Sequence, residues 1–131
     1  KNTKWLKNKF RNKFKIGLEN NNYYPTKAYD IIADADFISQ LVRDNKLFFL
    51  LDIAHAKVTA SNKKINYETY LKNLPLDVML QMHICRPNIN KKLSLDTHYL
   101  PNKKMFKEVK EISKKYKNLK FLTIEYYKDT K

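Results

Sequence analysis

Four short runs of apolar residues, separated by longer amphipathic stretches, constrain the fold of this chain more than any other feature. They span residues 14–19, 47–53, 78–83 and 120–125. The runs are rich in residues that favour β-strands and are too short for helices. Alternation of this kind is typical of strand–helix units built over a parallel sheet. The sequence therefore predicts an α/β fold with about four βα units and parallel strands.

The stretches between these runs carry apolar residues at helical spacing. One such face covers residues 28–42, a second covers 105–116, and a shorter one covers 67–71. Ahead of the first run, Trp5, Phe10 and Phe14 predict a basic amphipathic helix whose aromatic side chains face the core. The predicted order of elements is therefore αβαβαβαβ.

The length of the chain and the order of these elements indicate half of a barrel. A (β/α)₈ TIM barrel carries its chemistry on the loops after the carboxyl ends of its strands and takes about 250 residues. We therefore expect residues 1–131 to form a single unit, the second half of such a barrel, cut from a longer chain that does not begin at Lys1. A half barrel leaves two sheet edges unpaired, so it needs a partner or its missing amino-terminal half.

Charge and cysteine content limit the environment and the partners. A net charge of +14 attracts nucleic acid, acidic lipid or an acidic protein, and it can also simply coat exposed helices. The single cysteine, Cys85, cannot form an internal disulfide, and a lone intracellular cysteine is most often a small buried residue. No apolar run approaches the roughly 20 residues that span a bilayer. We expect a cytoplasmic protein without a membrane segment.

A residue able to bind a metal follows each of the four predicted strands. Carboxylate oxygen and imidazole nitrogen together suit zinc, iron or manganese, and seven such residues are more than one ion usually needs. Crowded carboxylates repel one another unless cations compensate. The sequence therefore predicts a multinuclear metal site formed by Glu19, Asp52, His55, His83, Asp96, His98 and Glu125.

Taken alone, each of these elements has a plainer interpretation. An Asp-x-x-His pair such as Asp52 and His55 is most often a turn or a capping group, and a single histidine such as His83 is most often structural. Asp96 and His98 are alternate residues of an extended segment, so their side chains can point toward one ion. The joint placement at the strand ends is what favours a metal site.

Five segments of the chain resemble a known family. They read GLENNNYY, LLDIAHAKVTASN, LPLDVMLQMHI, LSLDTHYLP and FLTIEYY, and the resemblance runs from about Lys15 to Tyr127. These segments are similar to the second half of the multinuclear non-heme iron-dependent oxidative enzymes, which include the oxidase of methanobactin biosynthesis. The resemblance implies a barrel of the xylose-isomerase-like type that uses two or three irons and dioxygen.

This resemblance also implies a function and a division of the ligands. The function is oxidative modification of cysteine-containing, ribosomally made precursor peptides, often with a partner protein that presents the peptide. The family's first half would supply further histidines. The implied roles are a bridging carboxylate from Glu19, one iron held by Asp52, His83 and Glu125, and another held by His55, Asp96 and His98.

Two other functions stay open. Endonuclease-IV-type enzymes are similar in the spacing of a Glu, an Asp-x-x-His, a His followed by Asp-x-His, and a final Glu, and they use three zinc ions to cleave abasic DNA. The basic charge favours that function slightly, but no glycine-rich segment follows His98. The other alternative is a basic module that binds nucleic acid or protein without catalysis, which predicts salt-sensitive binding that survives loss of the ligands.

Overall fold

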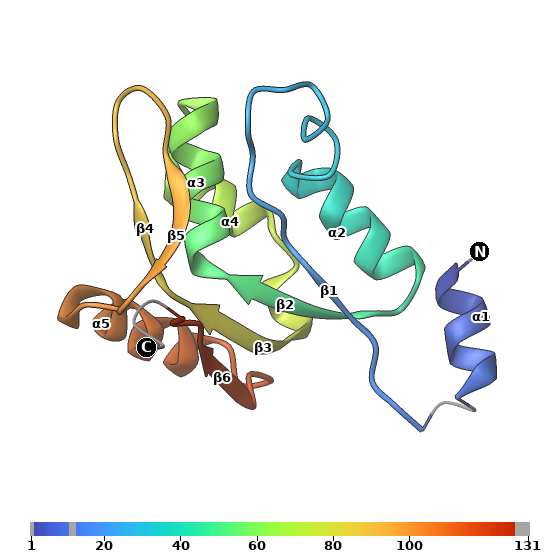
Figure 1. Ribbon diagram of the computed structural model, residues 1–131. Coiled ribbons are helices and arrows are strands. Elements are labelled where there is room, and N and C mark those ends of the chain that lie inside the picture. The colour runs from blue at the N-terminus through green and yellow to red at the C-terminus, as the bar shows by residue number, and fades with distance from the viewer. Residues whose placement is uncertain (1, 11–12, 128–131) are drawn as a thin grey trace.

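The computed structural model describes residues 2–10 and 13–127. Residues 1, 11–12 and 128–131 of the predicted single unit lie outside the described residues. Figure 1 shows the arrangement of the elements, which in chain order are α1 (Asn2–Lys9), β1 (Gly17–Glu19), α2 (Ala35–Asp44), β2 (Phe48–Asp52), α3 (Ile53–Lys63), α4 (Tyr67–Asn73), the 3₁₀ helix η1 (Leu76–Val78), β3 (Met79–Ile84), β4 (Arg86–Asn88), β5 (Leu95–Tyr99), α5 (Lys103–Lys115) and β6 (Phe121–Ile124).

Four of the strands form one parallel sheet in the order β1-β2-β3-β6. Its register pairs Asp52 of β2 with His83 of β3, and His83 with Thr123 of β6. Strands β4 and β5 form a separate antiparallel pair that follows directly on β3. The predicted α/β fold with parallel strands is confirmed, and the carboxyl ends of the four strands meet at one edge of the sheet.

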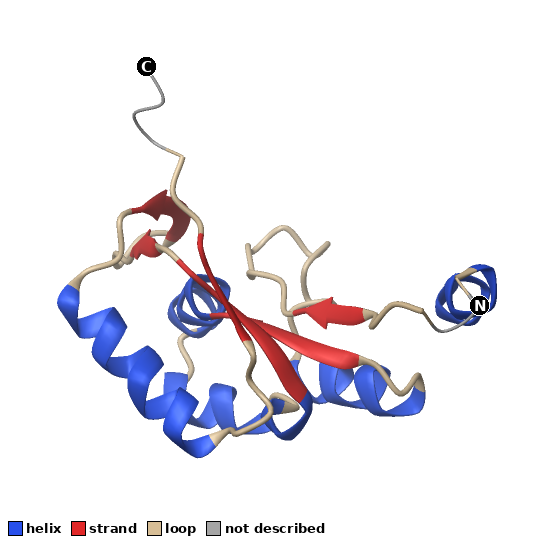
Figure 2. Ribbon diagram, turned by 90° about the horizontal axis from the view of Figure 1, so that it is seen from below, coloured by secondary structure: helices blue, strands red, loops and turns tan. Residues whose placement is uncertain are grey.

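Helices α2, α3, α4 and α5 pack on one face of this sheet (Figure 2). A single core cluster joins Phe49 and Leu51 of β2 and Met82 of β3 to apolar residues of α2, α3, α4 and α5. The alternate strand residues, such as Leu50 and Gln81, point to the other face and are only half-buried. This arrangement is compatible with part of a (β/α)₈ barrel, in which the uncovered face would line the interior. Closure into a barrel stays a prediction.

The helix predicted over residues 28–42 begins later than expected. Residues 25–33 form turns, and α2 starts at Ala35. The Asp34 side chain caps this helix by accepting a hydrogen bond from the backbone N–H of Phe37 at 2.9 Å. Ile31 and Ile32, which were expected on the apolar helix face, are instead 64% and 43% exposed.

Two features were not predicted from the sequence. Helix α3 occupies residues directly after β2, where the sequence analysis places no helix, so β2 and β3 are joined by two helices and η1. The pair β4–β5 also interrupts the predicted strand–helix alternation. Among the described residues, no helix is long and apolar enough to cross a membrane.

The prediction that the amino-terminal aromatic residues face the core is wrong. Helix α1 has no buried residue, and Trp5 and Phe14 are 57% and 64% exposed. Polar contacts join α1 to the end of α2: Thr3 Oγ1 donates to Asn45 Oδ1 at 2.9 Å, and Lys7 Nζ donates to the Asn45 carbonyl at 2.6 Å. These polar contacts position α1 without burial of its aromatic side chains.

Candidate metal centre

The topology brings the seven predicted ligands to the carboxyl edge of the sheet. Glu19 and Asp52 are the last residues of β1 and β2, His83 is the last but one of β3, and Glu125 directly follows β6. His55 comes from the first turn of α3. The remaining two, Asp96 and His98, come from β5.

Six of these side chains form a closed ring in which carboxylates and imidazoles alternate, called the ligand ring below. Each neighbouring pair lies within 4 Å. The distances round the ring are Glu19 Oε1 to His55 Nδ1 3.5 Å, His55 Nε2 to Asp96 Oδ2 3.1 Å, Asp96 Oδ1 to His98 Nδ1 3.4 Å, His98 Nε2 to Glu125 Oε2 3.1 Å, Glu125 Oε1 to His83 Nδ1 2.9 Å, and His83 Nδ1 to Glu19 Oε1 3.7 Å.

The seventh predicted ligand, Asp52, is fully buried beside this ring. Its Oδ1 accepts a hydrogen bond from the backbone N–H of His55 at 2.7 Å and so caps α3. Its Oδ2 is buried and has no hydrogen-bond partner among the described residues. Burial raises the pKa of Asp52 to about 6, although the nearby His55 opposes the shift. The free carboxylate oxygen is therefore costly unless a cation lies near it.

His83 Nδ1 is, like Asp52 Oδ2, a buried atom without a hydrogen-bond partner among the described residues. This nitrogen lies near the Glu125 and Glu19 carboxylates without the geometry of a hydrogen bond. On the opposite side of the imidazole, Gln81 Nε2 lies 2.8 Å from His83 Nε2 and also donates to Thr123 Oγ1. Gln81 therefore fixes the orientation of the imidazole and leaves Nδ1 facing the carboxylates.

Histidine 55 is held from both sides. Its Nδ1 lies 2.8 Å from the backbone carbonyl of Asn20, and its Nε2 faces Asp96. Burial by itself lowers the pKa of His55, but the hydrogen bond to Asp96 and the charge of Asp52 outweigh it and raise the pKa to about 9. Burial by itself raises the pKa of Asp96, but hydrogen bonds from His55 and Cys85 outweigh this effect and lower the pKa.

The backbone of His98 adopts an uncommon conformation, with φ of 48° in the left-handed region. Its imidazole contacts Asp96 and Glu125, and the Tyr127 hydroxyl lies 2.9 Å from Nδ1. The Tyr127 ring also packs against the imidazole, with 4.5 Å between the ring centroids. Such backbone strain persists where surrounding contacts over-determine a position, which is common at functional sites.

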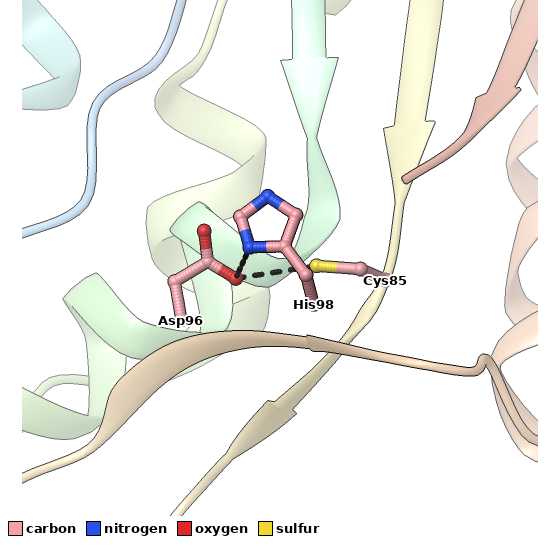
Figure 3. A group of neighbouring side chains, drawn as sticks. All are labelled: Cys85, Asp96 and His98. Atoms are coloured by element: carbon pink, nitrogen blue, oxygen red, sulfur yellow. Dashed lines mark hydrogen bonds and ion pairs between the residues drawn. The ribbon is translucent and has the colours of Figure 1, made fainter. Parts of the chain in front are cut away.

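The structure places Cys85, Asn20 and Gln81, which are not among the predicted ligands, against the ligand ring. Cys85 Sγ donates to Asp96 Oδ1 at 3.2 Å, and Figure 3 shows Cys85, Asp96 and His98 close together. Its spacing of two residues from His83 was an available signal, because alternate residues of a strand face the same side. Gln81 has the same spacing from His83 and contacts it within β3, whereas Asn20 carries no such signal, since its role depends on contacts with β2.

The residues present fit metal ions. Ligand atoms lie within 4.8 Å of one another in three groups of side chains. One, Asp52 with His83 and Glu125, coincides with a ligand set implied by the family resemblance. Four carboxylates also exceed three imidazoles, so the cluster is negative even if every imidazole is protonated. Assignment of these residues as ligands stays a prediction. The groups are Cys85, Asp96 and His98; Glu19, Asp52 and His55; and Asp52, His83 and Glu125.

Comparisons with known proteins give relatives but no solved structure with a significant match. A protein of Caulobacter vibrioides strain NA1000 / CB15N, named UPF0276 protein, is 34% identical over 84 residues, which are 64% of this chain and 30% of that protein. A UPF0276 protein of Paraburkholderia phytofirmans is 30% identical over 86 residues, 62% of this chain and 28% of that protein. The chain thus spans less than a third of the length of these relatives.

A family model covers most of the chain. Residues 7–126 match the family described as RiPP precursor modification enzyme MbnB/TglH/ChrH, where RiPP denotes a ribosomally made, post-translationally modified peptide. The matched range includes all seven predicted ligands. The matched range also includes Asn20, which bonds to the Asp52 backbone, and Cys85, which donates to Asp96. The chain therefore belongs to the MbnB/TglH/ChrH family of RiPP precursor modification enzymes.

Proposed function

We propose that this chain carries part of the metal centre of an enzyme that oxidatively modifies cysteine-containing precursor peptides, using two or three iron ions and dioxygen. The observation that carries the proposal is the ligand ring, together with the buried Asp52 Oδ2 that has no hydrogen-bond partner in the described part of the chain. Membership of the family supports a ribosomally made precursor peptide as the substrate.

The side chains of this region would hold and orient the ions. His55 would bind through Nε2, because its Nδ1 faces the Asn20 carbonyl, and His83 would bind through Nδ1, because its Nε2 faces Gln81. Hydrogen bonds of this kind fix which nitrogen is free to bind a metal. The family resemblance implies a bridging carboxylate from Glu19, whose Oε1 lies 3.7 Å from His83 Nδ1. Iron bound there would supply redox chemistry with dioxygen and a site for the substrate thiolate.

The proposal includes parts outside this chain. A peptide-presenting partner protein would deliver the precursor peptide, and an amino-terminal half would complete the barrel and supply further histidines. The uncovered face of the sheet supports the second of these parts, because parallel strands normally have both faces covered. So do the edges of β1 and β6, which are unpaired among the described residues.

The first test is elemental analysis of protein purified without oxygen, followed by dioxygen consumption with a cysteine-containing peptide. We expect iron at more than one equivalent in the complete protein. A double variant, His83→Ala with Asp96→Ala, should lose metal and activity while circular dichroism shows the fold largely kept, because the ligands lie at the rim of the sheet. The matched control is Asp36→Ala, an exposed acidic residue of α2 outside the ligand ring.

The same measurements separate the alternative functions. Zinc in place of iron, with cleavage of abasic DNA that needs no dioxygen, would favour the phosphodiesterase. Absence of metal, with salt-sensitive binding that the double variant retains, would favour a module without catalysis. Either result would overturn the oxidative proposal.

A further inference from the structure

The side chain of Cys85 lies beside the ligand ring, directly after the strand that supplies His83. Cys85 is the residue between β3 and β4. Because side chains alternate along an extended chain, Cys85 and His83 project to one side, whereas Ile84 between them belongs to the core cluster. Cys85 is fully buried, so its sulfur contacts protein groups rather than solvent.

Three atoms that can each bind a metal ion, a sulfur, an oxygen and a nitrogen, converge at this position. Asp96 Oδ1 lies 3.2 Å from Cys85 Sγ and 3.4 Å from His98 Nδ1. The ligand atoms of all three residues lie within 4.8 Å of one another (Figure 3). The other oxygen of Asp96 contacts His55, so the cysteine is connected directly to the ligand ring.

A second observation, independent of the cysteine, points to a cation in the two neighbouring ligand groups that share Asp52. Asp52 is fully buried, and its Oδ2 has no hydrogen-bond partner among the described residues. The negative charges of Asp52 and Asp96 both act on the Cys85 thiol. Negative groups gathered in a buried region are unfavourable unless a positive ion balances them.

We propose that Cys85 is a thiolate ligand of the proposed metal centre, binding one ion together with Asp96 and His98. This inference rests on the proposed function, since it requires a metal ion at the centre. On binding, a sulfur–metal bond forms and the thiol proton leaves to solvent, with no change of oxidation state. In the absence of a metal, burial and the contact with the Asp96 carboxylate raise the pKa of the Cys85 thiol, so the bound ion itself would have to displace the proton.

A sulfur ligand would change which metals the centre prefers. Soft thiolate donors favour iron, zinc and copper over magnesium and manganese, which prefer oxygen. The mixed sulfur, nitrogen and oxygen set of Cys85, His98 and Asp96 would therefore differ from the purely nitrogen and oxygen group of Asp52, His83 and Glu125. The two positions should bind a given metal with different affinity.

Cobalt(II) is a suitable probe because its spectrum reports its ligands. The protein, loaded with cobalt(II) without oxygen, should show weak visible bands from the bound ion and an intense near-ultraviolet charge-transfer band from a thiolate. Cys85 is the single cysteine of the sequence. We expect Cys85→Ser to lose the charge-transfer band while some cobalt stays bound at the other ligands.

The matched control is Ile84→Val, a conservative change at the neighbouring buried residue, which should keep the band. Cobalt bound without a charge-transfer band in the parent protein would overturn thiolate ligation and leave the metal centre standing. No bound cobalt at all would overturn the metal centre and the ligation with it. The spectrum of the parent protein decides these outcomes even if Cys85→Ser does not fold.

Discussion

At Asp52, one carboxylate oxygen closes the end of a helix while the other lies free beside the ligand ring. The sequence alone offers capping and metal binding as competing interpretations of Asp52 and His55. The structure confirms capping, through the 2.7 Å hydrogen bond from the His55 amide to Oδ1. It leaves Oδ2 without a hydrogen-bond partner among the described residues, so capping does not use up the metal-binding capacity of this residue.

Replacing Asp52 with Asn separates these two roles. Asn caps a helix about as well as Asp does, but it removes the buried charge. The raised pKa, about 6 against an ordinary 3.8, means that the charged carboxylate destabilises the metal-free fold above pH 6. We expect metal-free Asp52→Asn to exceed the parent in unfolding free energy at pH 7 by up to about 3 kcal/mol, at about 1.4 kcal/mol per pKa unit.

The pH dependence and the effect of metal check this prediction. As pH falls from about 6 toward the unfolded value near 3.8, the folded parent takes up the proton, so the difference between the two proteins should shrink. Bound metal should make the unfolding free energy of the parent the larger of the two, because the metal stabilises the parent more than the variant. Urea denaturation across this pH range, with and without iron(II), measures both. A metal-free variant less stable than the parent at pH 7 would contradict the argument.

Asn20 holds the backbone of Asp52 through its side-chain amide. It is fully buried, and its amide forms two hydrogen bonds with the backbone of Asp52, accepting from the N–H at 2.8 Å and donating to the carbonyl at 3.0 Å. Asn20→Ala leaves both backbone groups unpaired, so we expect a loss of about 3 kcal/mol in unfolding free energy. Chemical denaturation of Asn20→Ala and of the control Asn21→Ala, which keeps both bonds, tests this.

At the scale of the element, the strands were predictable and helix α3 was not. The four runs alternate clearly with amphipathic stretches, so the strands lie within a few residues of their predicted positions. Helix α3 buries Ile53, Ala54, Ala56 and Val58 on several sides, and a helix buried all round shows no helical period. Strand β4 contains Pro87 and is three residues long, so it is defined by its pairing with β5 rather than by its sequence.

Glu108 of helix α5 forms hydrogen bonds with residues of two other helices. Its carboxylate accepts from Lys57 Nζ of α3 at 2.5 Å and from the Tyr67 hydroxyl of α4 at 2.6 Å. Because both partners would be left unpaired, we expect Glu108→Ala to lower the unfolding free energy by about 2 kcal/mol. The control is Glu111→Ala on the same helix, whose carboxylate pairs with Lys114 at an exposed position; a surface change of this kind costs within about 0.5 kcal/mol. Equal effects in urea denaturation would count against the Glu108 contact.

At the scale of the whole molecule, the candidate site follows from topology more than from local sequence. Parallel strands bring their carboxyl ends to one edge, which is why seven candidate ligands far apart in the chain could be predicted from the sequence. The ring order could not be predicted, because it depends on how β5 lies over the edge of the sheet. Cys85 was left out of the predicted site because a lone cysteine is more often a small buried residue than a metal ligand.

The four-stranded sheet has two open edges among the described residues. Strands β1 and β6 each pair on one side in the described structure, and a closed barrel would bring further strand ends, with their own ligands, to the same rim. We therefore expect a version of this protein extended at its amino end to bind more metal per chain than residues 1–131 alone. Elemental analysis of both proteins, purified without oxygen, compares the ratios. Equal ratios would show that the ligand ring already holds its full set of ions, and the half-barrel interpretation of the metal centre would then be wrong.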